Sequence, residues 1–315
     1  MSDVGFFEND FYDLTISILN GFVGNEFNLE VAVKREDQID TFVSGNKFRK
    51  LKYNLIEAQN LRQKTLLTFG GAFSNHIAAT ARAGQRCGFK TIGVIRGEEL
   101  GVNLDQTLQQ NPTLKFAYEC GMQFEFVTRK AYREKESAAF NQKLREQFGD
   151  FYFIPEGGTN ALAVKGCKEI LSENTKDFDY IACAVGTGGT IAGIVEASLP
   201  HQKVLGFPAL KGDFLNAEIK KYTSKANWEL INRYHFGGYA KVNEKLVQFI
   251  NDFKKQHGIQ LDPVYTGKMM FGLTDLMRNG FFSKNTRILA VHTGGLQGIA
   301  GMNAKLSKKG YPQII

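Results

Sequence analysis

The hydrophobic positions of the chain fall into two alternating kinds of segment. Short apolar runs with β-branched residues predict buried strands at 29–33, 65–69, 91–96, 123–128, 151–155, 180–185, 203–208 and 287–292. Helical patterns between them predict helices at 47–62, 75–87, 104–120, 131–148, 161–173, 190–199, 243–256 and 268–279. This strand–helix order predicts an α/β protein with open, twisted, mostly parallel sheets and helices on both faces.

Composition limits the class of protein. The chain has 315 residues, 43% of them hydrophobic and 23% charged, which suits a globular protein with a substantial core and one large or two medium domains. Only six prolines occur, so no flexible linker is expected between domains. No apolar run approaches the roughly 20 residues that span a bilayer, and residues 1–10 lack the pattern of a secretory signal. We therefore expect a cytoplasmic protein with no membrane partner.

Charge and cysteine usage exclude two further classes. The net charge of +7 is spread along the chain without a block of like charges, so we expect no nucleic-acid partner. The four cysteines lie far apart without CxxC spacing, which predicts reduced thiols and neither a metal site nor a disulfide framework. They are Cys87, Cys120, Cys167 and Cys183.

Paired glycines mark four predicted junctions between a strand and a helix, at 70–76, 157–160, 186–190 and 293–298. Ligands of open α/β sheets bind at the carboxyl ends of strands, where such junctions lie. Short connecting loops also need glycine for geometry alone, so one junction by itself carries little weight. Four junctions together with Lys47 favour a ligand site.

The junction at 186–190 has the features of a phosphate site. It follows a predicted strand, opens a predicted helix and offers free N–H groups and two hydroxyls to an anion. Its residues are Gly186, Thr187, Gly188, Gly189 and Thr190. The third position of a GxGxxG fingerprint is Ile191 here, and no Walker lysine follows. A small phosphate ester therefore fits better than a dinucleotide.

An ordered set of motifs points to a family. The motifs are KRED at 34–37, SGNKFRKL at 44–51, GGAFSNH at 70–76, PEGGTNA at 155–161, GTGGT at 186–190, VYTGK at 264–268 and HTGG at 292–295. Over residues 29–300 the chain resembles the D-cysteine desulfhydrase and 1-aminocyclopropane-1-carboxylate deaminase family. The resemblance implies pyridoxal 5′-phosphate as cofactor and the tryptophan synthase β-like fold, fold type II of these enzymes.

The resemblance implies roles for residues that bind the cofactor. Lys47 matches the Schiff-base lysine, which needs an amine that is neutral near pH 7, as burial beside other cations provides. Without this context, a lone lysine would be read as a solvated helix residue. Lys50 lies one helical turn on and matches the lysine that reaches the phosphate. Tyr265 matches a tyrosine beside the ring that moves protons, although a core tyrosine is the alternative.

The resemblance also implies a substrate site. Ser74, Asn75 and His76 match the loop that receives the substrate carboxylate, and Asn75 also lies beside the cofactor ring. A helix-cap or core histidine is the alternative for His76. Gly158 and Thr159 complete the predicted substrate site.

Two positions bear on the reaction. Deaminases of the cyclopropane amino acid generally have Glu after the tyrosine and Leu before the last Gly-Gly, whereas this chain has Thr266 and Thr293. A carboxylate near the pyridine nitrogen makes the cofactor a stronger electron sink, and threonine hydroxyls can only hydrogen-bond that nitrogen. The resemblance is therefore to the desulfhydrase type.

The resulting hypothesis is α,β-elimination from a small amino acid, with D-cysteine converted to pyruvate, hydrogen sulfide and ammonia. In this scheme Lys47 takes the Cα proton, and Ser74 or Tyr265 assists by proton transfer. The alternatives are a 1-aminocyclopropane-1-carboxylate deaminase and, from another class, a non-catalytic protein that binds pyridoxal phosphate or an amino acid.

The family also implies an architecture. A large cofactor-binding domain consists of residues 1–47 and 151–315, and a smaller α/β domain of residues 48–150 is inserted into it. The cofactor lies in the cleft between them, and the protein is a homodimer.

Overall fold

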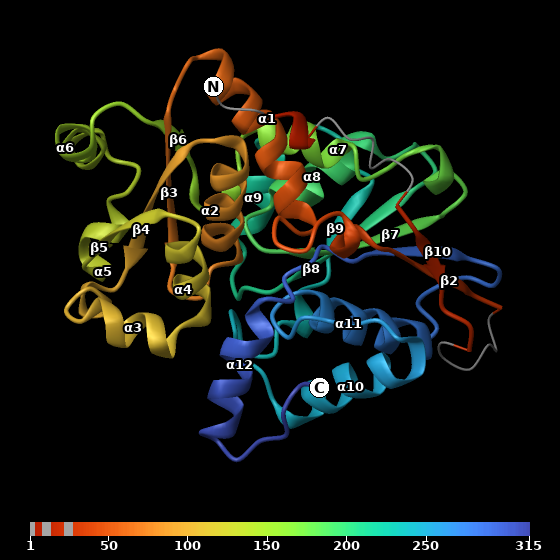
Figure 1. Ribbon diagram of the computed structural model, residues 1–315. Helices are drawn as coiled ribbons and strands as arrows, with labels where there is room; N and C mark the ends of the chain where they lie inside the picture. The colour runs from red at the N-terminus through yellow and green to blue at the C-terminus, as the bar shows by residue number, and fades with distance from the viewer. Residues whose placement is uncertain (1–3, 8–13, 22–27) are drawn as a thin grey trace.

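Two sheets organise the computed structural model, which describes residues 4–7, 14–21 and 28–315 (Figure 1). The six-stranded sheet has the order β1-β2-β10-β7-β8-β9, and all its neighbouring pairs are parallel except β1 with β2. Its strands are β1 (Ile16–Ile18), β2 (Glu30–Lys34), β7 (Tyr180–Val185), β8 (Lys203–Pro208), β9 (Trp228–Leu230) and β10 (Arg287–Val291). Residues 1–10, in which the pattern of a secretory signal is lacking, lie partly outside the described ranges.

The second sheet is all parallel and has the order β5-β4-β3-β6. Its strands are β3 (Thr65–Gly71), β4 (Lys90–Arg96), β5 (Met122–Val127) and β6 (Tyr152–Ile154). In Figure 1 it lies on the left, next to α2 to α6. The helices of the chain are α1 (Asn46–Asn60), α2 (Asn75–Cys87), α3 (Leu104–Gln110), α4 (Pro112–Glu119), α5 (Arg129–Arg133), α6 (Ala138–Phe148), α7 (Ala161–Lys168), α8 (Gly189–Ala197), α9 (Phe214–Lys220), α10 (Glu244–His257), α11 (Thr266–Arg278) and α12 (Gly298–Ser307).

Helices cover both faces of the larger sheet. On β7, Ala182 and Ala184 face a core that includes residues of α10 and α11, while Ile181, Cys183 and Val185 face α7 and α8. Successive side chains of a strand point to opposite faces, so this alternation places the two helical layers on opposite sides. The predicted fold class, with mostly parallel sheets between helices, is confirmed.

Helices also cover both faces of the smaller sheet. On β3, Leu66 packs in a cluster with residues of α1 and α2, whereas Leu67 and Phe69 pack with Leu144 of α6. Strands buried on both faces read as continuous apolar runs, which explains why the sequence pattern predicted these strands well.

Two predicted helices are each divided in two. Pro112 begins α4, because it lacks an N–H and suits only the first turn of a helix, and Asn111 caps that turn by accepting from Leu114 N at 3.0 Å. The helix predicted at 131–148 is replaced by α5 and α6, with Ser137 as the cap of α6. The pattern missed four short or terminal elements, β1, β9, α9 and α12.

The division into domains stays a proposal, and the sheets bear on its boundary. Strand β6 (Tyr152–Ile154) pairs with β3 in the smaller sheet, although the predicted boundary at 150/151 assigns it to the large domain. The chain therefore leaves the smaller sheet after β6. Among the described residues, no helix is long and apolar enough to cross a membrane.

Candidate functional site

The loop that begins α1 packs directly against the loop that follows β10. Gly45 has φ 60°, a conformation that favours glycine, and a Cβ there would lie 2.1 Å from Thr293 O. Asn46 N donates to the same carbonyl at 3.2 Å. The side chain of Asn46 donates to Thr190 Oγ1 at 2.9 Å. Two of the four predicted paired-glycine junctions, 186–190 and 293–298, therefore meet at the start of α1.

Lys47 lies in the first turn of α1 and is half-buried. Its Nζ donates to Asn46 Oδ1 at 3.2 Å. Burial, reinforced by the positive charge of Lys50, lowers the pKa of Lys47 to about 7. The amine is therefore neutral in a large fraction of molecules at neutral pH, as a nucleophilic lysine requires.

Lys50, one turn further along α1, joins two other loops of the site. Its buried Nζ donates to Gly157 O at 3.0 Å, to Thr159 Oγ1 at 2.9 Å and to Thr187 Oγ1 at 3.3 Å. The two threonine hydroxyls lie 2.5 Å apart. Burial lowers the pKa of Lys50 as well. Thr159, predicted in the substrate site, thus contacts the lysine and the predicted phosphate loop.

The predicted phosphate loop connects β7 to α8 as expected from the sequence. Gly188 caps α8 with φ 88°, and Gly189 and Thr190 form its first turn, so the free N–H groups of that turn lie at the loop. A Cβ on Gly189 would lie 2.8 Å from Thr159 Cγ2, which leaves room only for glycine. Gly186, Thr187, Gly188, Gly189 and Thr190 are therefore brought together with Lys50 and Asn46.

Tyr265 immediately precedes α11 and lies over the phosphate loop. A Cβ on Gly186 would lie 3.2 Å from Tyr265 Cε1 and 3.4 Å from its hydroxyl oxygen. The rings of Tyr265 and Tyr239 meet edge to face at 6.3 Å. Burial, with the nearby Tyr239 and Asp262, raises the pKa of Tyr265 well above its usual value. Tyr265 therefore stays protonated and can donate a hydrogen bond.

Ser74 and Asn75 lie at the start of α2, after β3. Ser74 caps the helix by accepting from Ile77 N at 3.4 Å. Asn75 contacts the loop after β10, because a Cβ on Gly295 would lie 2.9 Å from Asn75 Nδ2 and Gln297 Nε2 donates to Asn75 O at 3.3 Å. The loop predicted to receive a carboxylate is thus held against the loop after β10.

His76 turns its imidazole into the interior. Its Nε2 lies 2.8 Å from Thr68 Oγ1, which donates to Ile154 O at 2.8 Å, so His76 Nε2 is the donor of that pair. Burial, with the charges of Lys47 and Lys50, lowers the pKa of His76 well below its usual value. A Cβ on Gly158 would lie 3.0 Å from His76 Cε1. The ring is a neutral, buried support for the 157–158 loop, and its role toward a substrate stays a prediction.

Thr266 and Thr293 differ in their surroundings. The hydroxyl of Thr266 donates to Asp262 Oδ1 at 2.8 Å and accepts from Asp262 N at 2.9 Å, so both of its capacities are used inside the protein. Thr293 is buried after β10, and no hydrogen bond of its hydroxyl occurs among the described residues. Of the two, Thr293 has the hydroxyl available to a ligand, and both roles stay predictions.

The residues present fit pyridoxal phosphate. In the part of the chain that the structure describes, neither Lys47 nor Lys50 forms an ion pair with a carboxylate, which leaves the charge of Lys50 for an anionic ligand and the amine of Lys47 for the aldehyde. A helix N-terminus and two threonine hydroxyls face the same place, and Lys47 supplies the neutral amine that an aldehyde needs. The described residues contain no cluster of three His, Cys, Asp or Glu that would suit a metal ion.

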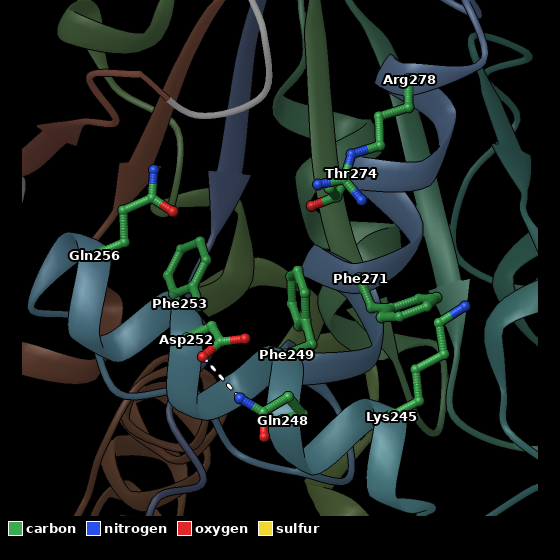
Figure 2. A pocket seen from close by; sticks show the side chains of 9 residues that line it. All are labelled: Lys245, Gln248, Phe249, Asp252, Phe253, Gln256, Phe271, Thr274 and Arg278. Atoms are coloured by element: carbon green, nitrogen blue, oxygen red, sulfur yellow. Dashed lines mark hydrogen bonds between the residues drawn. The ribbon is translucent and has the colours of Figure 1, made fainter.

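A groove with an apolar lining lies elsewhere on the molecule. It has a volume of about 450 Å³ and runs along α10 and α11, where Phe249, Phe253 and Phe271 form its apolar lining (Figure 2). Its polar residues include Lys245 and Arg278. The candidate site is identified by its chemistry and not by cavity size.

Comparison with known proteins agrees with the site. Residues 19–294 match the model of the family described as pyridoxal-phosphate dependent enzyme. The chain belongs to this family. A Thermotoga maritima protein with the provisional name 1-aminocyclopropane-1-carboxylate deaminase is 33% identical over 90% of this chain and 94% of its own length. An Arabidopsis thaliana protein, named bifunctional D-cysteine desulfhydrase/1-aminocyclopropane-1-carboxylate deaminase, mitochondrial, is 30% identical over 86% of this chain and 73% of its own.

A solved structure supports the same assignment. The crystal structure of a protein described as an ACC deaminase homologue matches with a TM-score of 0.78 at 28% identity, covering 94% of this chain and 93% of that one. Pyridoxal phosphate is therefore the cofactor of this enzyme family, as the motifs predicted.

The sequence missed several residues that shape the site. Asp262 and Tyr239 contact predicted site residues but belong to no quoted motif, and Asn46 lies in the motif at 44–51 without having been predicted as a site residue. Asp262 could have been found, because an acidic residue shortly before a helix start commonly caps its N–H groups. Tyr239 gave no such signal, since only the tertiary fold brings it to Tyr265.

Proposed function

We propose that the chain catalyses α,β-elimination from a small amino acid, with D-cysteine as the preferred substrate. D-cysteine and water would give pyruvate, hydrogen sulfide and ammonia. The observation that carries the proposal is the half-buried Lys47, whose pKa is about 7 and which lies where the glycine-rich loops meet. The names of the relatives support the reaction class.

Each residue of the site has a proposed role in this reaction. When bound, pyridoxal phosphate supplies an electron sink for the electrons of the broken Cα–H bond. The neutral amine of Lys47 takes the Cα proton, because its lowered pKa makes it a base at neutral pH. Lys50, Thr187 and Thr190 hold the phosphate, and the N-terminus of α2 at Ser74 and Asn75 binds the carboxylate.

Tyr265 is the proposed donor to the leaving group. Its phenol is protonated and lies beside Gly186, so it can donate a proton or a hydrogen bond to a departing thiolate. Ser74 is the other candidate donor on the opposite loop. The proposal keeps the domain division at 1–47 with 151–315 and 48–150, and it includes a homodimer located in the cytoplasm.

One alternative reaction has specific support. The Thermotoga maritima relative carries the name of a cyclopropane-carboxylate deaminase, so ring opening by this chain is the second candidate. The threonine at 266 argues against it, because its hydroxyl is held by Asp262 and no carboxylate stands at that position. A non-catalytic binding protein is the alternative of another class.

The deciding experiment measures release of 2-oxo acid by the cofactor-loaded protein, pyruvate from D-cysteine or L-cysteine and 2-oxobutanoate from 1-aminocyclopropane-1-carboxylate, in parallel. We expect release from D-cysteine and a loss of at least about a thousandfold in Lys47→Ala. Lys115→Ala, which removes an exposed lysine of α4, is the matched control. The cyclopropane acid would yield 2-oxobutanoate if the alternative reaction held, and a binding protein would turn over none of the three.

A further inference from the structure

Arg96 is the last residue of β4 and lies at the carboxyl end of the smaller sheet. In the parallel pairing of β3 with β4 it is the direct neighbour of Gly71. A Cβ on Gly71 would lie 3.6 Å from Arg96 Nη2. Gly71 O accepts from Ser74 N at 3.0 Å, so the guanidinium lies one tight turn from the residue that caps α2.

The charge of Arg96 is not balanced by a nearby carboxylate. The side chain is exposed, and none of the described carboxylates lies within ion-pair distance of its guanidinium. Other exposed arginines of the same part of the chain do have such partners: Arg129 pairs with Glu99, and Arg145 pairs with Asp150. Arg96 is therefore a cation available to a ligand.

The ring of Tyr132 lies beside this guanidinium. Arg96 Cζ lies 5.6 Å from the ring centre of Tyr132, a buried residue whose ring packs edge to face on Phe69 at 5.9 Å. Lys135 approaches the same ring, but its Nζ is 3.4 Å from Glu156 Oε2, which neutralises it. Stacking on a ring positions a guanidinium without consuming its N–H donors.

Arg96 also acts on the opposite wall of the site. Burial raises the pKa of Tyr239, and the positive charge of Arg96 opposes that shift, which places the two groups within electrostatic reach. Tyr239 contacts Tyr265, the tyrosine over Gly186. Arg96 therefore lies beside Gly71, at the turn that begins α2, and within electrostatic reach of Tyr239, the ring that contacts Tyr265.

We propose that Arg96 determines specificity by binding the β-substituent of the substrate, and that this substituent carries a negative charge. This inference rests on the proposed elimination reaction. As Lys47 takes the Cα proton, the bond from Cβ to the substituent breaks and both of its electrons leave with the substituent. The thiolate form of cysteine and a sulfate ester of serine are of this class, and the N–H donors of Arg96 match both anions.

The test compares two substrates in the cofactor-loaded enzyme, O-sulfo-D-serine with an anionic β-substituent and β-chloro-D-alanine with a neutral one. Both give pyruvate after elimination. The measured quantity is the ratio of their kcat/KM values in wild type, Arg96→Gln, Arg96→Lys and Arg145→Gln. Arg145 is the matched control, because it is an exposed arginine stacked on Phe151 at 4.6 Å in the same region of the chain.

We expect Arg96→Gln to lower the ratio by about tenfold or more, mainly through KM of the sulfate ester, because it removes the charge and leaves a shorter neutral polar side chain. Arg96→Lys should restore most of the ratio, and Arg145→Gln should leave it unaltered. An equal loss for both substrates in Arg96→Gln, or no loss, would overturn the inference while the elimination reaction stood. Absence of pyruvate from both substrates in wild type would overturn the proposed function together with this inference.

Discussion

The hydroxyl of Thr266 donates to Asp262 Oδ1 across 2.8 Å. The same carboxylate accepts from the backbone N–H groups of Val264 and Tyr265 at 2.8 and 2.9 Å. Asp262 thus satisfies donors at the N-terminus of α11 that would otherwise be buried without partners. The hydroxyl of Thr266 is part of the support that holds Tyr265 over the phosphate loop.

Thr266→Val should therefore act on stability first. Without the hydroxyl, Asp262 Oδ1 loses one of its donors and the backbone N–H of Asp262 loses its acceptor. This loss should lower the free energy of unfolding by about 1–3 kcal/mol. Urea denaturation of the cofactor-free protein measures this. Thr293→Val is the control, since its hydroxyl has no hydrogen bond among the described residues, and it should lose less than half as much. An equal loss in both variants would show that the Asp262 network is not the cause.

Cofactor uptake by the cofactor-free protein should depend on pH with a midpoint near 7. Only a neutral Lys47 amine can react with the aldehyde, and burial lowers its pKa to about 7. The rate of uptake, followed by absorbance, should rise as pH increases through 7 and then level off. A rate that still rises tenfold per pH unit up to pH 9 would contradict the lowered pKa.

Lys50→Met should move that midpoint upward. The positive charge of Lys50 contributes to the lowered pKa of Lys47, and its removal leaves desolvation as the one lowering cause, opposed by Cys167 and Asp262. The variant should also bind the cofactor more weakly, so the midpoint of the pH profile and not the absolute rate is the quantity to compare. Lys52→Met in the same helix should leave the midpoint in place, because Lys52 pairs with Glu169.

The stability of the cofactor-free protein should increase with pH above 7. Between about 7 and 10.5 the unfolded chain binds a proton at Lys47 that the folded chain has released, so the free energy of unfolding rises with pH. Lys47→Met removes this dependence. The variant should be more stable than wild type by on the order of 2–4 kcal/mol at pH 6, and the difference should shrink toward pH 10. If the difference in the free energy of unfolding between the variant and wild type were the same at pH 6 and pH 10, the lowered pKa of Lys47 would be contradicted.

A buried ion pair anchors the helix that carries both lysines. Arg49 contacts Glu36 through two hydrogen bonds, at 2.8 and 3.0 Å, and both side chains are nearly fully buried. Glu36→Gln should lower the free energy of unfolding by about 3–5 kcal/mol, because it leaves a buried cation without its main partner. The control is Glu99→Gln, which breaks the exposed pair with Arg129 and should change stability far less, because solvent screens that pair. Similar losses in the two variants would contradict the role of burial.

The strands and the motif-bearing loops were predictable because their signals are local. The apolar runs of β7 and β8 coincide with the observed strands, and the glycines at 186–189 lead into α8 as expected. The helix predicted at 104–120 was wrong because Pro112 can begin a helix but not continue through one. Short edge elements such as β9 have too few residues to show a period.

Side-chain direction was less predictable than position. His76 was correctly placed at the start of a helix. No sequence pattern shows that the ring of His76 points into the interior, where it contacts Thr68. Similarly, Thr266 is next to Tyr265 in sequence, and yet its hydroxyl is directed to Asp262. These outcomes depend on hydrogen bonds formed by the three-dimensional fold, and the availability of Arg96 is known only once its neighbours are placed.

The two lysines of the site link the supply of cofactor to the lifetime of the protein. Lys47 and Lys50 lie close enough to influence each other, and no described carboxylate forms an ion pair with either. A phosphate that binds only the folded chain relieves this repulsion and raises stability with its concentration. Cells remove unfolded chains continuously, so a small change in stability alters abundance. A shortage of the cofactor would therefore lower the amount of folded enzyme as well as the fraction of it that is loaded.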